Sequence, residues 1–353
     1  MKNSIILFVI ICLTFLFVVS CKQKESEATT IPLFVISQNG KYGYIDKTGK
    51  IVIEPKFDKA WDFSEGLARV RQNNGRGEGY IDKTGKIVIT PQFDKAWDFS
   101  EGLACVSKEF GGKWGYINKK GKYVIVPMFG PPTLSIQGRF SEGVAVVAVG
   151  DKYGYIDKKG NVFIRAQWDA AENFSEGLAA VRTSNKWGFI DKTGAYVIEP
   201  QYDVVGNFSE ELAYVVKKLG EEFGYINKKG EYVIKPKFRG VDKFSEGLAA
   251  VTIDGTRGYI DKTGQFVIEP QFGFVSNFSE GLAAVQIKGK WGYIDKTGKV
   301  VIKPEFDAPD FRGTGGFSEG VAHVSEMIRG EVGLIEKWGY INKTGEYIWK
   351  PTR

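Results

Sequence analysis

A sequence motif of fifteen residues recurs along the whole chain, and this repetition constrains the fold more than any other feature. It is clearest at residues 290–304, Lys-Trp-Gly-Tyr-Ile-Asp-Lys-Thr-Gly-Lys-Val-Val-Ile-Lys-Pro, and near-copies begin at Lys41 and Lys337. The glycine that follows the aromatic residue marks nine copies: Gly43, Gly79, Gly115, Gly154, Gly188, Gly224, Gly258, Gly292 and Gly339. A period of this kind indicates stacked structural repeats, each too small to bury its apolar face alone.

Each copy predicts a three-stranded antiparallel meander. In the copy from residue 174 to 200, alternation and apolar runs place the strands at 178–182, 186–191 and 196–198. Asp191-Lys-Thr-Gly194 predicts a hairpin, because Asp accepts hydrogen bonds from the following backbone and Gly takes a positive φ. The third strand is expected to end at Pro200, since proline cannot donate to a ladder. The glycine beside the aromatic residue is expected to let an aromatic side chain of the next unit approach the backbone.

The linkers between meanders carry two recurrent aromatic residues, which are Phe57 and Phe63 in the first copy. We expect these rings to be buried between neighbouring meanders, and part of each linker can pair as a fourth, irregular strand. Residues 33–36 supply a first strand, and the chain ends after a third strand at Pro351, so nine meanders are complete.

The resulting fold class is all-β, with nine tandem three-stranded antiparallel repeats of about 34–39 residues. The 44 glycines and the 14% aromatic content agree with a turn-rich β-protein. Residues 33–353 are predicted to form one repeat domain, arranged as a β-propeller-like ring in which radial closure protects the strand edges. An open, curved β-solenoid is the alternative.

The N-terminus has the features of an export signal. Lys2 precedes an apolar run from Ile5 to Val19, which is typical of a signal peptide. The following Val18-Val19-Ser20-Cys21 resembles the lipobox of bacterial lipoproteins, and this implies cleavage before Cys21 and lipid on that residue. An uncleaved anchor helix and an ordinary signal peptide are the alternatives.

The boundaries that follow are 1–20 for the signal peptide and 21–32 for a flexible, polar tether. Acyl chains on Cys21 would hold the protein at a membrane surface without a spanning helix. The predicted location is therefore the bacterial cell envelope, at the outer membrane or cell surface.

The repeated motif, followed by Phe-Ser-Glu-Gly-Leu-Ala-x-Val, resembles the signature of the bacterial WG (KWG) β-repeat family. The resemblance covers the chain from about residue 33 to 353. Glu78 and Arg257 depart from the signature aromatic, and we expect them to mark local differences of the surface. The signature tryptophans are Trp114, Trp187, Trp291 and Trp338. The resemblance implies β-repeats on secreted or envelope proteins, no agreed enzymatic activity and no functional residues to transfer.

The acidic residues that look catalytic are repeated, which argues for structural roles. A general acid needs one special environment, whereas a glutamate follows the serine of the same turn eight times, from Glu65 to Glu319. The hairpin Asp is likewise replaced by Asn in some copies. Two acidic groups could form weak Ca²⁺ sites, although their spacing matches no compact loop: Asp58, Asp62 and Glu65, and Asp94, Asp98 and Glu101.

Cysteine and histidine offer no obvious chemistry. Cys12 leaves with the signal peptide and Cys21 is acylated, so Cys105 is left as a small strand residue without a disulfide partner. His323 is the only histidine, which excludes multi-histidine metal sites and favours a place on a strand surface. The sequence thus predicts no catalytic residue, no metal site and no cofactor.

Charge argues against nucleic acid as a partner. Lys and Arg number 48 against 42 Asp and Glu, and the surplus is spread evenly over the repeats. Nucleic-acid binders usually gather basic residues in a stripe or tail.

Function is expected where the repeat is interrupted, at 128–138, 307–316, 325–336 and 71–77. Neutral drift in loop length is the alternative. The candidate partner-binding residues are Phe129, Leu134, Phe311, Met327, Ile328 and Leu334.

We expect a non-enzymatic, membrane-anchored envelope lipoprotein whose repeat scaffold binds a protein or glycan partner. A carbohydrate-active propeller hydrolase or lyase is one alternative, and a purely structural envelope element is another.

Overall fold

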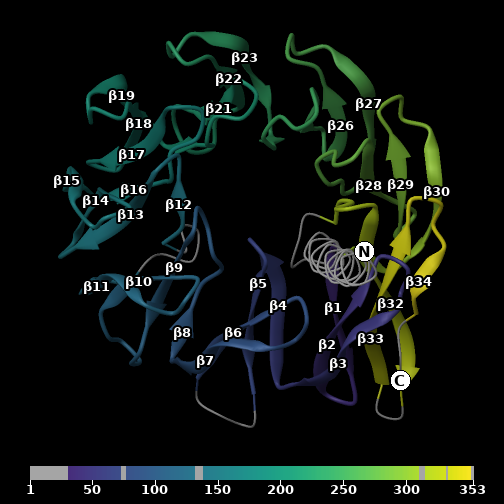
Figure 1. Cartoon of the computed structure of the whole chain (residues 1–353). Coiled ribbons are helices and arrows are strands. Elements are labelled where there is room, and N and C mark those ends of the chain that lie inside the picture. Colours follow the sequence, from purple (N-terminus) through teal and green to yellow (C-terminus); the bar gives the residue numbers. More distant parts are fainter. Residues whose placement is uncertain (1–30, 73–76, 132–137, 310–314, 331–332, 351–353) are drawn as a thin grey trace, which may run out of the picture. The chain divides into compact units, whose positions relative to one another are not determined.

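The computed structural model describes residues 31–72, 77–131, 138–309, 315–330 and 333–350. Within these ranges every regular element is a β-strand, and the strands form nine small antiparallel sheets in chain order (Figure 1). The predicted fold class, an all-β chain of nine tandem antiparallel repeats of the propeller type, is confirmed. The predicted signal peptide and Cys21 lie outside the described residues.

The chain forms two compact units, Met1–Gln92 and Phe93–Arg353. The N-terminal unit holds two sheets. The first consists of β1 (Leu33–Gln38), β2 (Lys41–Asp46) and β3 (Ile51–Phe57). The second consists of β4 (Lys59–Ser64), β5 (Leu67–Arg71), β6 (Glu78–Asp82) and β7 (Ile87–Phe93), which ends at the division between the units.

The C-terminal unit holds seven sheets. The first sheet consists of β8 (Lys95–Ala96), β9 (Leu103–Ser107), β10 (Trp114–Asn118) and β11 (Tyr123–Phe129). The second consists of β12 (Phe140–Ser141), β13 (Val144–Val149), β14 (Lys152–Asp157) and β15 (Val162–Trp168). The third consists of β16 (Ala170–Ala171), β17 (Ala179–Thr183), β18 (Lys186–Ile190) and β19 (Tyr196–Tyr202). The next two are β20 (Val204–Val205), β21 (Ala213–Val216), β22 (Phe223–Ile226) and β23 (Tyr232–Phe238), and β24 (Gly240–Val241), β25 (Ala249–Ile253), β26 (Thr256–Ile260) and β27 (Phe266–Phe272). The last two are β28 (Leu282–Ile287), β29 (Lys290–Asp295) and β30 (Val300–Phe306), and β31 (Ala308–Pro309), β32 (Val321–Gly330), β33 (Gly333–Asn342) and β34 (Tyr347–Trp349).

Seven of the nine sheets have four strands, so the predicted count of three is wrong for them. The extra strand is a short piece of the linker that pairs with the first strand of the meander, as Ala170 pairs with Arg182. In the sheet of β28 to β30, a single bridge between Val275 and Val285 occupies the same place. The linker adds this strand because the first strand of the meander would otherwise present an unpaired edge. The fourth, irregular strand that the linker allowed is confirmed.

The third strand was predicted to end at the repeated proline, but in seven sheets it contains this proline and runs two residues further. In β19, Trp187 pairs with Tyr202 and Phe189 with Ile198, so three residues of β19 lie opposite Gly188. Pro200 sits inside this bulge, where its missing N–H breaks no ladder bond.

The bulge also explains the glycine beside the aromatic residue. A Cβ on Gly188 would lie 2.5 Å from the Ile198 carbonyl oxygen and 2.7 Å from the Pro200 nitrogen. The glycine is therefore required by the backbone of its own sheet, and the expected approach of an aromatic ring from the next unit is wrong. The same close contact with the third strand occurs at Gly43, Gly79, Gly115, Gly154, Gly224, Gly258 and Gly292.

The hairpin between the second and third strands is as predicted. Oδ1 of Asp191 accepts hydrogen bonds from the N–H groups of Thr193 (2.8 Å) and Ala195 (3.2 Å), and Gly194 has a φ of 85°. A Cβ on Gly194 would lie 3.0 Å from the side chain of Ile164 in the preceding sheet. The turn glycine thus also brings the hairpin onto the neighbouring repeat.

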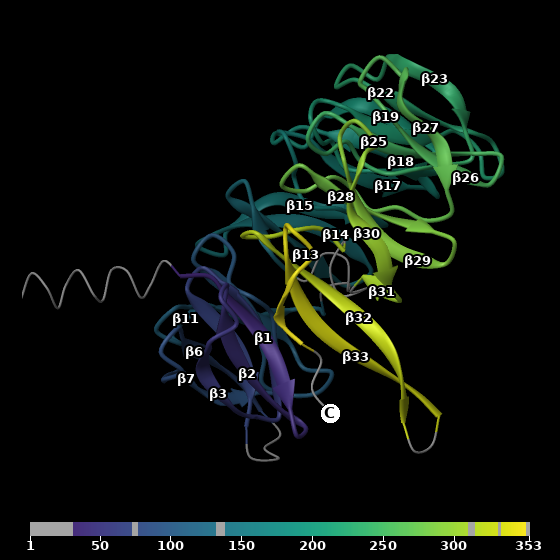
Figure 2. The same ribbon diagram turned by 90° about the vertical axis from the view of Figure 1, so that its right-hand side faces the viewer.

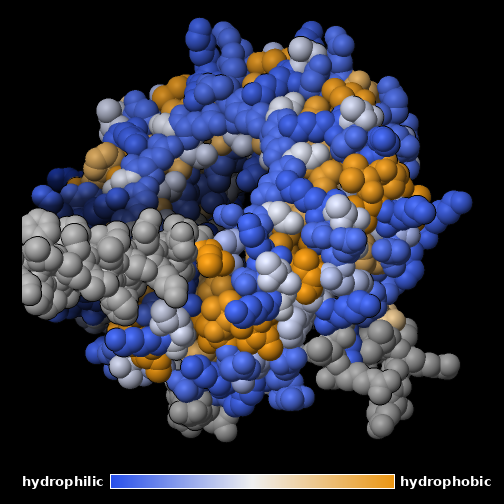
Figure 3. All heavy atoms as spheres, turned by 45° about the vertical axis from the view of Figure 1, so that its right-hand side comes forward, coloured by the Kyte–Doolittle hydropathy of each residue, from blue (hydrophilic) through white to orange (hydrophobic). Residues whose placement is uncertain are grey.

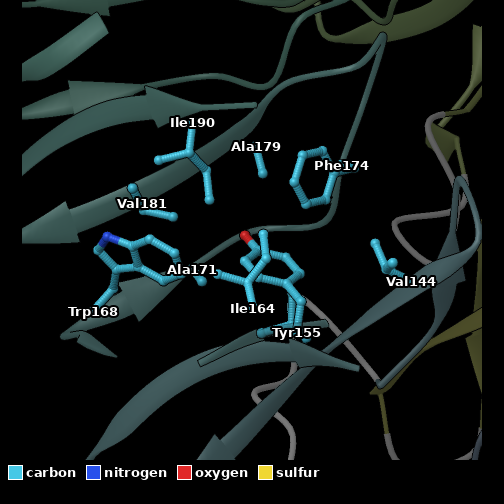
Figure 4. Packing of buried hydrophobic residues seen from close by; sticks show 10 residues of the cluster. Val144, Tyr155, Ile164, Trp168, Ala171, Phe174, Ala179, Val181 and Ile190 are labelled. Carbon is cyan, nitrogen blue, oxygen red and sulfur yellow. The ribbon is translucent and has the colours of Figure 1, made fainter. Parts of the chain in front are cut away.

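The apolar core lies between successive sheets. Figure 4 shows one such layer, in which Tyr155 and Trp168 of one sheet face Val181 and Ile190 of the next. Phe174 of the linker closes the layer, with its ring centroid 4.9 Å from that of Tyr155. Burying one such side chain stabilises the fold by about 1.5–3 kcal/mol. The linker aromatic residues are buried between repeats, as the sequence predicts.

The connection between the first and second strands of the last repeat, expected as a surface loop at 325–336, is instead a continuation of the two strands. β32 and β33 have ten residues each, whereas the corresponding strands elsewhere have four to six. Their ladder continues through Glu326–Lys337 and Ile328–Ile335 to the pair Gly330–Gly333. Figure 2 shows these two strands extending past the rest of their sheet. No proline occurs between Val321 and Gly330, so nothing interrupts the ladder of the first strand there.

Candidate functional site

The repeated Ser-Glu-Gly turn is a two-residue hairpin in which glutamate adopts an unusual backbone conformation. In one copy, Ser245 and Leu248 exchange backbone hydrogen bonds of 2.9 and 3.2 Å, and Glu246 and Gly247 have φ values of 55° and 89°. Positive φ at both central residues defines a type I′ turn, which normally favours Asn and Gly. Left-handed backbone at a non-glycine residue costs about 1–2 kcal/mol, so the glutamate must be retained for another contact.

That contact is with the next repeat. The carboxylate of Glu246 accepts a hydrogen bond from the backbone N–H of Gly281 (3.0 Å) and forms an ion pair with Lys296 (3.1 Å). The Ser245 hydroxyl donates to the carbonyl of Phe278 (2.8 Å). Burial of the Glu246 carboxylate opposes its ionisation, but the bonds from Lys296 and Gly281 outweigh this, so the pKa lies below its ordinary value.

The same link is repeated along the C-terminal unit, in which each carboxylate bonds a backbone N–H and a lysine of the following repeat. The N–H bonds join Glu101 to Gly143, Glu142 to Gly177, Glu176 to Glu211, Glu210 to Gly247, Glu246 to Gly281 and Glu280 to Gly320. The glutamates are therefore structural, as predicted, but they join repeats to one another in addition to occupying the turn.

In each repeat, one residue of the linker faces one residue of the first strand of the meander, and both differ from copy to copy. One lies two residues before the linker phenylalanine, and the other is the third residue of Leu-Ala-x-Val. The N–H of Gly206 donates to the carbonyl of Tyr214 (2.9 Å), and a Cβ on Gly206 would lie only 2.2 Å from the tyrosine ring. The pairs are complementary in size: Trp97 with Cys105, Glu172 with Ala180, Gly206 with Tyr214, Asp242 with Ala250, and Ser276 with Ala284.

Two of these residues, Tyr214 and Asp242, line a polar pocket of about 430 Å³ in the C-terminal unit. This volume falls in the range of small-molecule sites, roughly 300–1,000 Å³. The lining comes from four consecutive linkers and one strand: Ser175, Asn207, Phe208, Ser209, Tyr214, Asp242, Lys243 and Asn277. It is the candidate functional site.

The pocket offers both hydrogen-bond donors and acceptors. The carboxylate of Asp242 is bound by the guanidinium of Arg257 (3.1 Å), and Lys243 is exposed. The side-chain oxygen of Asn277 is buried and has no hydrogen-bond partner among the described residues. Burial, then the carboxylates of Asp242 and Glu172, raise the pKa of Tyr214, so its hydroxyl remains a neutral donor.

The neighbouring Glu172 and Asn173 extend this polar surface. Burial raises the pKa of Glu172, and the buried side-chain oxygen of Asn173 has no hydrogen-bond partner among residues of the described ranges. The backbone carbonyl of Glu172 is occupied, since it accepts a hydrogen bond from the hydroxyl of Tyr155 (2.8 Å).

The six partner-binding residues expected from the sequence do not form this site. Phe129 ends β11 opposite Trp114 and is only 7% exposed, so its prediction as a surface contact is wrong. It is the buried linker aromatic of its repeat and precedes the inserted residues. Met327 is 42% exposed on β32. Leu134 and Phe311 lie outside the described residues, as do the side chains of Ile328 and Leu334, whose backbones belong to the extended ladder.

Cysteine and histidine lie within the fold. Cys105 is a buried strand residue, as predicted, with its sulfur 2.7 Å from where a Cβ of Gly138 would be. His323 is half-buried rather than placed on an open strand surface, since its ring stacks on Trp338 with centroids 4.8 Å apart.

The two departures from the signature aromatic are ionic. Glu78 is 1% exposed and forms an ion pair with Arg71 (2.9 Å), so its expected surface position is wrong. Arg257 uses the same position to reach Asp242 at the pocket.

The acidic groups weighed as calcium ligands have other partners. Asp58 is bound by Lys41, and Asp98 by Arg139. In the described part of the chain, no group of three or more His, Cys, Asp or Glu side chains is placed to hold a metal ion. The same residues contain no helix with the length and apolarity needed to cross a membrane.

The exposed apolar residues lie mainly on the third strands of the sheets. Figure 3 shows one face, largely hydrophilic, with apolar residues in separate patches. Four of these strands expose one such residue, for example Val197 and Val233 at 43% and 45%, and four expose two or three, as β11 does. Isolated apolar side chains of this kind are normal on protein surfaces.

The pocket residues could not be predicted from the repeat alone, because their role depends on how the linker residue and the strand residue that face each other vary together from copy to copy. The available signal was the variation itself, since Tyr214 stands where three other copies have alanine, and it faces Gly206, where a Cβ would meet its ring.

The geometry is that of a β-repeat protein with a polar pocket on its linkers. The family model for the WG containing repeat matches eight segments of the chain: 42–75, 79–114, 114–130, 153–187, 187–218, 223–256, 258–291 and 291–326. The chain belongs to the WG repeat family. No curated protein matches the chain.

Several solved structures are similar in fold. A crystal structure of a eukaryotic initiation factor has a TM-score of 0.60 at 10% identity, and the match covers 90% of this chain and 95% of that one. Hsv2p of Kluyveromyces lactis gives 0.41 at 10% identity, with 81% and 98% covered. Virginiamycin B lyase of Staphylococcus aureus gives 0.36 at 15% identity, with 67% and 91% covered. At these identities the similarity concerns the fold alone.

Proposed function

We propose that the chain is a non-enzymatic binding protein of the bacterial cell envelope, exported and held at the membrane by lipid on Cys21. One observation supports the binding role above all. Tyr214, Asp242 and Lys243 differ from the residues at the same place in other copies, and they line a polar pocket together with the shared residues Ser175, Phe208 and Ser209. A purely structural element would have no need for such a pocket.

The lipid anchor rests on the N-terminal sequence. Cys21 follows an apolar segment at the position that a lipobox requires, and residues 22–30 are polar apart from Ala28. Metabolic labelling with a radioactive fatty acid should label the chain and leave a Cys21→Ser variant unlabelled. Equal labelling of the variant would refute the anchor.

The binding role is tested with protein and protein-free fractions of the cell envelope. The protein-free fraction is followed by saturation-transfer NMR, and the protein fraction by cross-linking. We expect a component to bind the wild-type chain and to bind less to Tyr214→Ala, a variant with the alanine of other copies at this position. If no component of either fraction binds, the proposal fails.

A hydrolase or lyase acting on carbohydrate is the second candidate, because Glu172 and Asp242 bring two carboxylates toward Tyr214 and the pKa of Glu172 is raised by burial. A raised carboxyl pKa is what a general acid requires. Against this, Asp242 is neutralised by Arg257. Turnover of a glycan that disappears in Glu172→Gln would favour the enzyme, whereas unchanged binding without turnover favours the scaffold.

A further inference from the structure

We infer that the pocket takes a neutral, hydroxyl-rich ligand, with the chemistry of a saccharide. This inference names the ligand class of the pocket and rests on the proposed binding function. It is carried by the charge balance of the pocket, by its mixture of donors and acceptors, and by the aromatic ring at its side.

The charges around the pocket compensate each other. Asp242 lies 3.1 Å from the guanidinium of Arg257, and the positive Lys243 lies next to it in the lining. Glu172 is half-buried close to Tyr214. Together the carboxylates of Asp242 and Glu172 balance the cations of Arg257 and Lys243, so no net charge is left that would select an anion or a cation, which an ionic ligand would need to offset its desolvation.

The hydrogen-bonding groups suit hydroxyls. The buried oxygens of Asn173 and Asn277 are acceptors without a partner among the described residues, and a buried acceptor without a partner is unfavourable. Asn207, Lys243 and the Tyr214 hydroxyl supply donors on the same pocket. A hydroxyl group both donates and accepts, so a chain of neighbouring hydroxyls can satisfy such a mixed set.

Tyr214 adds the apolar element that a sugar ring requires. Its ring lies over Gly206, where a Cβ would be 2.2 Å from the nearest ring carbon, and it lines the pocket together with Phe208. The face of an aromatic ring is electronegative and attracts the polarised C–H groups on one side of a pyranose. The four linkers therefore place planar amides and an aromatic ring around one space.

The test uses the full chain, solubilised in a detergent without a sugar headgroup. Chitotriose, cellotriose, maltotriose and mannotriose are the neutral probes, and 3′-sialyllactose and glucosamine trimer are the charged comparators. Binding is measured by saturation-transfer NMR and by titration calorimetry. Tyr214→Ala and Asn277→Ala remove one ring and one acceptor from the pocket. Phe274→Ala is the matched control, because Phe274 is an aromatic residue that is 61% exposed and does not line the pocket.

We expect at least one neutral trisaccharide to bind more tightly than either charged comparator. Tyr214→Ala should weaken its binding about five- to tenfold, the size of a lost ring contact, and Phe274→Ala should leave it unchanged. The inference is overturned if a charged comparator binds more tightly or if all neutral probes fail to bind. It is also overturned if both pocket variants bind the trisaccharide as tightly as the wild type does. If the neutral probes fail but an envelope component still binds in a Tyr214-dependent manner, the binding function stands and the saccharide class falls. If nothing binds, both fall.

Discussion

The substitution Glu246→Asn separates the two roles of the repeated glutamate. Asparagine is well suited to the left-handed turn, where Glu246 has a φ of 55°, but its side chain is one methylene too short to keep the contacts with the next repeat. If turn conformation were the main contribution, the variant would be more stable than the wild type. If the link between repeats is the larger contribution, the variant is less stable, so the two explanations predict opposite signs.

The magnitude follows from the contacts. The lost hydrogen bond from Gly281 (3.0 Å) ends on a charged group and contributes about 1.5–3 kcal/mol. The ion pair with Lys296 joins side chains that are 31% and 45% exposed, so it adds about 0.2–1 kcal/mol. Relief of the left-handed backbone returns about 1 kcal/mol. We expect a net loss of about 1–3 kcal/mol.

Hydrogen exchange at the Gly281 amide is the direct assay, because tandem repeats need not unfold in one step. Its exchange should become about five- to a hundredfold faster in the variant. Lys288→Asn is the matched control, since Lys288 has a φ of 51° in a hairpin turn and its side chain makes no hydrogen bond or ion pair among the described residues. The control should be neutral or slightly stabilised. If Glu246→Asn behaves like this control, the carboxylate does not join the repeats.

The remaining predictions concern acid stability, two glycines and the buried thiol. The pKa of Glu246 is below its ordinary 4.5 in the folded chain, so its carboxylate stabilises the fold fully above pH 4.5 and ceases to do so as the pH falls through the folded pKa. In Glu246→Gln, the free energy of unfolding measured in urea should therefore decrease less steeply as the pH is lowered. Gly188→Ala should cost at least about 2 kcal/mol in thermal unfolding, because the new Cβ meets a backbone oxygen at 2.5 Å. Gly206→Ala should destabilise the chain, and adding Tyr214→Ala should restore most of the loss in a double-mutant cycle. Burial raises the pKa of Cys105, so iodoacetamide should modify it only in denaturant, as mass spectrometry would show.

The local structure of the repeat could be predicted from sequence because it depends on residues close together in the chain. The hairpin that begins at Asp191 needs only its own four residues, and it forms as expected. The behaviour of Pro200 could not be predicted in the same way. A proline usually ends a strand, but here a three-residue bulge removes the need for its N–H, and the bulge depends on Gly188 in another strand.

The candidate site was harder to predict because it depends on contacts between repeats. Phe129 was expected at the surface since it adjoins an insertion, yet its place in the repeat makes it a core residue, at 7% exposure. Tyr214 alone is not distinctive in a chain with many aromatic residues. Its meaning appears only when it is paired with Gly206, eight residues earlier in sequence and in contact through the hairpin of the linker.

The repeats therefore divide their residues between two tasks. The glutamate and the serine recur because each side chain meets the same group in the next repeat, and loss of the carboxylate would break a link such as Glu246–Gly281. The linker positions facing the pocket have no such obligation, so Lys243 can stand where two other copies have Asn207 and Asn277. In a protein of this kind, the residues to test for binding are those in which one copy departs from the others while the links around it remain intact.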